Sequence, residues 1–115
     1  FILMANVYKN IQAVISSAGA DVDMYTVPEA TTSIVKSIKL YNTHSSNLVV
    51  DIKVYDLSST TDFEWDSVTV TTDNSVDLLT FNNVLVLEAG DILRMQTPTT
   101  NVVKMTASVL QTSRS

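Results

Sequence analysis

The sequence predicts an all-β fold, an antiparallel β-sandwich or jelly roll of about eight to nine strands. The chain of 115 residues is rich in Val, Ile and Thr, and only two glycines and two prolines interrupt it. Branched side chains of this kind favour strands over helices. Apolar and polar residues alternate along several segments, and short linkers rich in Ser, Thr, Asn and Asp separate them. Because such linkers favour turns, we expect hairpins within a single domain over residues 1–115.

Two segments show the alternation of a strand with one buried and one solvated face. Leu48–Asp56 places four apolar side chains on one face: Leu48, Val50, Ile52 and Val54. Val102–Gln111 does the same near the end of the chain with Val103, Met105, Ala107 and Val109. We therefore expect both sets to face the core.

Two further strands carry an irregularity. In Ser33–Tyr41 the residues Ile34, Ile38 and Leu40 align, but Lys36 lies on their face. Either the stem of this lysine extends to the rim of the core, or a bulge shifts the register. Asp62–Val70 places Phe63 and Trp65 on one face and Val68 and Val70 on the other. A bulge near Asp66–Ser67 would reconcile the two halves.

The remaining strands are weaker, and the two ends of the chain are open to more than one interpretation. Short strands are expected at Val22–Val27, Val76–Phe81, Val84–Glu88 and Asp91–Thr97. Residues 1–15 are heavily apolar for a free tail, so they form either a docking segment for another subunit or the first strand of their own sandwich. Met4 resembles a natural start, with Phe1–Leu3 as an extension. The polar end, Thr112–Ser115, is expected to be exposed and mobile.

Composition argues against several classes of protein. The net charge is −5, and the seven basic residues are scattered along the chain. Nucleic-acid binding requires clustered Lys and Arg, so we expect no direct contact with DNA or RNA. No apolar run approaches the about 20 residues that span a bilayer, so we expect no membrane span. There is no cysteine, which excludes a disulfide framework and a thiolate zinc site in these residues.

Residues capable of chemistry are few and dispersed. His44, the single histidine, lies among small turn-forming residues and has no partner at a readable spacing. Glu64 and Asp66 are two positions apart, and on a regular strand they project to the same side, near the separation of a glycosidase pair. A solvated strand face is the simpler interpretation. Thr71–Asp77 loosely resembles a calcium loop but lacks its glycine and its final bidentate glutamate.

No nucleophile elbow, phosphate-binding loop or dinucleotide fingerprint is present. Trp65, the single tryptophan, is either a core residue or a platform on which a sugar could stack. We therefore expect a protein that is not an enzyme, with no catalytic residue, no metal ligand and no cofactor.

Several stretches together resemble a known group of proteins. They are Tyr25–Pro28 (YTVP), Thr32–Thr43, Val50–Val54, Leu85–Leu93 (with VLEAGD) and Val103–Leu110, preceded by MANVYKN at Met4–Asn10. The pattern resembles that of small virion proteins of tailed bacteriophages, of the type found in marine and cyanobacterial phages. The resemblance covers most of the chain. Thr61–Val70 departs from it, being acidic and aromatic.

The resemblance implies a non-enzymatic structural protein of the virion, a capsid decoration, neck, tail or fibre-associated building block with a β-sandwich fold. It implies homo-oligomers and other virion proteins as partners, and an acidic surface suits a position outside the packaged DNA. The alternative is a carbohydrate- or receptor-binding module of a phage fibre. The candidate partner contacts are the exposed aromatic and apolar positions and one acidic neighbour: Phe1, Ile2, Leu3, Tyr8, Phe63, Glu64 and Trp65.

Overall fold

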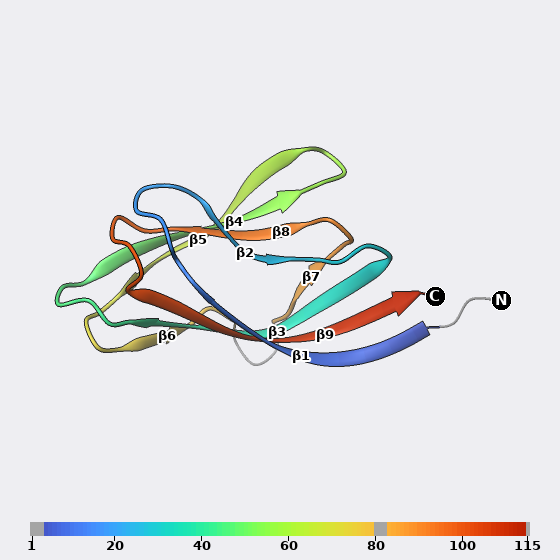
Figure 1. Cartoon of the computed structure of the whole chain (residues 1–115), viewed down its shortest axis with the longest axis horizontal. Helices are drawn as coiled ribbons and strands as arrows, with labels where there is room; N and C mark the ends of the chain where they lie inside the picture. Colours follow the sequence, from blue (N-terminus) through green and yellow to red (C-terminus); the bar gives the residue numbers. More distant parts are fainter. Residues whose placement is uncertain (1–3, 80–82, 115) are drawn as a thin grey trace.

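The structure, a computed structural model, describes residues 4–79 and 83–114, which fold into two antiparallel sheets packed face to face (Figure 1). One sheet has the order β1-β9-β3-β6, with β7 also paired to β3. The other has the order β2-β8-β4-β5. The nine strands of the described residues are Met4–Val14 (β1), Val22–Thr26 (β2), Thr31–Asn42 (β3), Leu48–Asp56 (β4), Thr61–Val70 (β5), Ser75–Asp77 (β6), Leu85–Leu87 (β7), Ile92–Gln96 (β8) and Val103–Arg114 (β9).

This arrangement confirms the predicted all-β sandwich. Residues 4–79 and 83–114 contain no helix, and therefore none that is long and apolar enough to cross a membrane. In Figure 1 the sheet that contains β1, β9 and β3 forms the lower layer, and β4, β5, β8 and β2 lie above it. The core lies between these two layers.

The alternating patterns of β4 and β9 predicted the core correctly. Leu48, Val50 and Ile52 are buried on β4, and only Val54, towards the end of the strand, is half-buried. All four predicted residues of β9 are buried: Val103, Met105, Ala107 and Val109. Each strand removes one apolar face from water, which is the main stabilising contribution in a sandwich of this size.

A bulge explains the position of Lys36 on β3. The pairing of β3 with β9 shifts register between Val35 and Ser37, which leaves Lys36 as the extra, exposed residue. Of the two alternatives, the bulge is therefore the correct one. It also corrects the expected core face, because Val35 is buried together with Ile38 and Leu40, whereas Ile34 points to the other side and is half-buried.

A second bulge lies on β5, one residue before the predicted position. Ile52 of β4 pairs with Asp66, and the next residue, Lys53, pairs with Glu64, so Trp65 is the extra residue. Trp65 is half-buried and packs against the core. Phe63, which was expected on the same face, is 53% exposed, because β5 is an edge strand.

The two ends of the described chain form one long antiparallel ribbon. β1 pairs with β9 without a register shift from Met4 with Arg114 to Val14 with Lys104. Residues 4–14 are thus a strand of their own sheet, and docking of this segment on a partner stays a prediction. The expected free tail is wrong for its first part, since Thr112 and the following residues to Arg114 belong to β9. The predictions for Phe1, Ile2 and Leu3, and for positions 80 and 81 of the expected Val76–Phe81 strand, lie outside the described residues.

A buried amide fixes the turn between β3 and β4. Asn42 is fully buried at the end of β3. Its Nδ2 donates hydrogen bonds to the carbonyl oxygens of Ser46 (3.0 Å) and Val70 (2.9 Å), and its Oδ1 accepts one from the backbone N–H of His44 (2.8 Å). One side chain thereby joins the turn to β5, which lies in the opposite sheet.

Candidate interaction surface

The few residues capable of chemistry do not converge in the described structure. His44 lies half-buried in the turn after β3. Within residues 4–79 and 83–114, no three side chains of His, Cys, Asp or Glu come close enough to hold a metal ion. Glu64 and Asp66, which a regular strand would project to the same side, do not share a side either. Glu64 pairs with Lys53, whereas Asp66 pairs with Ile52, so the Trp65 bulge turns them to different sides of β5 and the expectation of a shared side is wrong.

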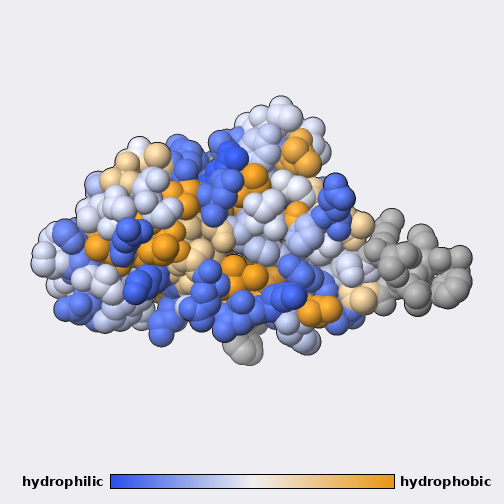
Figure 2. Space-filling model, in the orientation of Figure 1, coloured by the Kyte–Doolittle hydropathy of each residue, from blue (hydrophilic) through white to orange (hydrophobic). Residues whose placement is uncertain are grey.

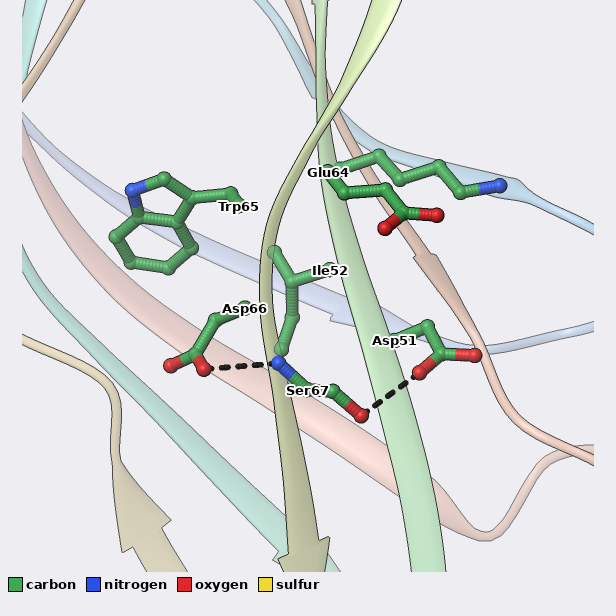
Figure 3. A pocket seen from close by; sticks show the side chains of 7 residues that line it. Asp51, Ile52, Glu64, Trp65, Asp66 and Ser67 are labelled. Atoms are coloured by element: carbon green, nitrogen blue, oxygen red, sulfur yellow. Dashed lines mark hydrogen bonds between the residues drawn. The ribbon is translucent and has the colours of Figure 1, made fainter.

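The bulge opens a hollow of about 380 Å³ between β4 and β5 (Figure 3). Ser67 donates from its Oγ to Asp51 Oδ1 (2.8 Å) and from its backbone N–H to Asp66 Oδ1 (2.8 Å). Figure 3 shows the indole of Trp65 on the opposite side of β5 from Asp51 and Glu64. A sugar site needs an aromatic face and polar groups around the same ligand. Of the three carboxylates that line the hollow, only Asp66 lies on the same side of β5 as the indole, so the geometry does not favour carbohydrate binding.

We expect no divalent-metal requirement and no hydrolytic activity. Adding EDTA should leave the melting temperature unchanged, because no described group of ligands would lose a cation. Assays with glycosides and esters should show no turnover above buffer, because Glu64 and Asp66 point apart. A fall of many degrees in the melting temperature with EDTA would contradict the first expectation. Turnover that is lost in Glu64→Gln or Asp66→Asn would contradict the second.

The outer face of the β2-β8-β4-β5 sheet is charged. Arg94 on β8 binds Asp23 (Nε to Oδ1, 2.8 Å) on one side and Asp62 (Nη1 to Oδ1, 3.0 Å) on the other. Lys53 Nζ lies 3.1 Å from Asp21 Oδ2. The hydrogen bond to Asp23 raises the pKa of Arg94, and the one to Asp21 raises the pKa of Lys53. Such a network of ion pairs is compatible with a face that stays in water.

The outer face of the other sheet is different, because apolar side chains line up across it. Tyr8 on β1 pairs with Leu110 on β9, Leu110 pairs with Ile34 on β3, and Ile34 pairs with Val86 on β7. Directly opposed residues share a face of a sheet. We call these four residues the apolar row: Tyr8, Leu110, Ile34 and Val86.

The apolar row is accessible to solvent at both ends. Tyr8 is 74% exposed and Val86 is 56% exposed, and the two residues between them are half-buried. Lys36 extends over the Tyr8 ring, with its Nζ 6.0 Å from the ring centroid. Figure 2, which views the two layers from the side, shows hydrophobic residues at the surface of both, among hydrophilic ones. Neighbouring apolar side chains of this kind are unusual on a sheet face that contacts only water.

No protein-family model and no curated protein matches the sequence. Among solved structures, the chain is similar to a protein of Bacillus endospore appendages, which form disulfide-linked pili. The two are 12% identical with a TM-score of 0.51, over 97% of this chain and 88% of the other. It is also similar to a chain of the virus-like particle of the extra small virus of the giant freshwater prawn Macrobrachium rosenbergii. Here the identity is 11% and the TM-score 0.53, over 95% of this chain and 79% of the other.

What these proteins share with this chain is the fold. At such low identity the similarity does not extend to individual residues, so it assigns no contact on either face. Nothing in these similarities points to tailed phages in particular, and that part of the sequence resemblance stays a prediction.

The candidate partner contacts from the sequence fall into two regions. Tyr8 belongs to the apolar row, whereas Phe63, Glu64 and Trp65 lie on β5, the edge strand of the other sheet. Phe63 and Glu64 are exposed and Trp65 is half-buried. Their role as contacts stays a prediction. The other three members of the apolar row were missed, because only the strand register places them beside Tyr8.

Proposed function

We propose that this chain is a non-enzymatic structural subunit that packs in many copies on the surface of a virion. The sequence resemblance makes a tailed phage the preferred particle, with the chain as a capsid decoration or a neck- or tail-associated protein. The β-sandwich is also the fold of a subunit from a pilus and of one from a virus-like particle, both of them assemblies of many copies. That similarity supports a subunit role.

The apolar row is the observation that carries this proposal. The two outer faces of the sandwich contrast, since one holds ion pairs around Arg94 and the other presents Tyr8 and Val86 to solvent. Interface cores are poor in charge and rich in aromatic residues compared with ordinary surface. The face with the apolar row therefore lies against neighbouring subunits in the assembly, and the face around Arg94 stays in water.

The contacts that residues 1–115 make between subunits of the assembly would be non-covalent. The pili of the endospore appendages are disulfide-linked, but this sequence has no cysteine. Affinity must come from buried apolar surface and from hydrogen bonds, and symmetry then repeats each contact in every subunit. We do not extend the proposal to a carbohydrate-binding module, because Asp51 and Glu64 lie on the opposite side of β5 from Trp65 and only Asp66 lies beside it.

Val86→Asp should abolish incorporation into particles while leaving the fold intact. Val86 is 56% exposed, so the charge is solvated in the free subunit but would be desolvated against a neighbour. The measurement is the amount of each variant that co-sediments with particles assembled in its presence, beside its melting temperature as a free protein.

The matched control is Val49→Asp. Val49 is 49% exposed and lies on the other sheet, on the solvated side of β4. This variant should join particles at the level of the unmodified protein. Equal incorporation of both variants would contradict the proposed orientation. An unmodified protein that never sediments with any particle would contradict the proposed function itself.

A further inference from the structure

The outer edge of β1 has free backbone groups at every second residue. In the described part of the chain β1 pairs with β9 alone. Just after β1, the backbone N–H of Ile15 donates to the carbonyl of Val103 (3.0 Å), in continuation of the same register. N–H and C=O groups alternate in direction along an antiparallel strand. Odd-numbered residues of β1 therefore bond to β9, and four even-numbered ones direct both groups outwards: Asn6, Tyr8, Asn10 and Gln12.

Within residues 4–79 and 83–114, the other sheet edges are protected against pairing, and the edge of β1 is not. β5 carries the Trp65 bulge and three acidic residues, and β2 is short and irregular between Asp23 and Tyr25. β6 and β7 have three residues each. Bulges, charges and short length are the usual means by which edges avoid other chains. β1 runs for 11 residues without a bulge and with Lys9 as its one charged residue.

We propose that the edge of β1 pairs with the β1 edge of a second copy of this chain, antiparallel and about a two-fold axis. The inference rests on the proposed role as an assembling subunit and names its first partner. Among the described strands, β1 alone offers a free edge of matching length without an interruption. A two-fold axis at any residue of β1 pairs each even-numbered residue with an even-numbered residue of the second copy. The outward N–H and C=O groups of the two copies therefore face each other and can form hydrogen bonds.

The side chains place the two-fold axis at Tyr8. An axis at Lys9 would set two lysines directly opposite each other, which is unfavourable. An axis at Tyr8 pairs Val7 with Lys9 of the second copy, and Asn6 with its Asn10. It also brings the two Tyr8 rings together, so the apolar row continues across the axis into the second copy. The five exposed residues from Asn6 to Asn10 then pair with the same five residues of the second copy.

Cysteine cross-linking tests this register, because the sequence has no cysteine of its own. Val7 and Lys9 are odd-numbered, so they would meet as a non-hydrogen-bonded pair, whose short separation suits a disulfide. A mixture of Val7→Cys and Lys9→Cys proteins, oxidised together, should give a cross-linked heterodimer, and each variant alone should stay uncross-linked. A self-linked Val7→Cys or Lys9→Cys product, or a mixture without any product, would overturn the register about Tyr8.

A proline variant tests the backbone pairing. Asn10→Pro removes an outward N–H and leaves the ladder to β9 complete, and proline is tolerated on an edge strand in this way. Two hydrogen bonds are lost per dimer, so dimerisation measured by sedimentation should weaken by about tenfold or more. Asn10→Ala keeps the N–H and should dimerise like the unmodified protein. Equal melting temperatures of the monomers confirm that the fold is retained.

The outcomes separate this inference from the proposed function. Dimers that persist in Asn10→Pro but are lost in Val86→Asp would overturn pairing through β1 and would still support a subunit that docks through the apolar row. A protein that is monomeric at every concentration would overturn the β1 dimer, and particle co-sedimentation would then decide the proposed function by itself.

Discussion

Replacing Asn42 with aspartate is expected to destabilise the fold by about 3 to 5 kcal/mol at neutral pH, the range for an uncompensated buried charge. The side chain is fully buried, and its Nδ2 donates to the carbonyls of Ser46 and Val70. A carboxylate oxygen in its place would face both carbonyl oxygens without a proton to share. Only the hydrogen bond from the His44 N–H would remain. Urea unfolding at pH 7 measures the effect.

The same substitution should become less harmful as the pH falls. Burial beside two carbonyls raises the pKa of the new carboxyl in the folded state above the ordinary value of about 3.9. The penalty is therefore complete above the folded-state pKa and shrinks as the pH falls through it, because the neutral acid can donate to one carbonyl.

Asn47→Asp is the matched control for this prediction. Asn47 belongs to the same turn but is exposed, and its Oδ1 accepts from the N–H of Thr72, a bond that a carboxylate preserves. It should change the free energy of unfolding by less than about 0.5 kcal/mol. Similar small losses for both variants would show that Asn42 does not hold the turn.

Asn42 also shows where sequence reasoning ended. It is the last residue of β3 and precedes a run of turn-forming residues, a type that also favours turns. Its second hydrogen bond reaches Val70, far along the chain and in the opposite sheet. A local pattern cannot show such a contact, because it exists only once the two sheets have packed.

The same reason explains which strands were predicted well. β4 and β9 each have one face in the core and one towards solvent, so their sequences alternate without interruption. β3 and β5 each contain a bulge, and an extra residue reverses the alternation beyond it. The reversal reveals that a bulge exists, but it leaves the position uncertain by a residue. This explains the errors at Ile34 and at the pair of Glu64 and Asp66.

The candidate surface was predictable only in part. Tyr8 was predicted as a contact because it belongs to an N-terminal segment that is heavily apolar for a free tail. Ile34, Leu110 and Val86 could not be joined to it, because they come from three other strands and meet only through register. Once the bulge at Lys36 is known, Ile34 falls on the outer face of the sheet. An apolar residue at this position is the local sequence feature that indicates an apolar outer face.

Ile52→Ala is expected to lower the free energy of unfolding by about 2 to 5 kcal/mol, as large-to-small core changes do. Ile52 is 1% exposed and lies on β4, the inner strand that joins β8 and β5, opposite Met95 and Asp66. Because β4 is held by β8 on one side and by β5 on the other, the backbone cannot move in to fill the space of the lost side-chain atoms, so a cavity should remain. Val49→Ala, on the solvated face of the same strand, should cost less than about 1 kcal/mol in the same urea titration. Equal losses for the two variants would contradict the register of β4, and with it the assignment of its two faces to core and solvent.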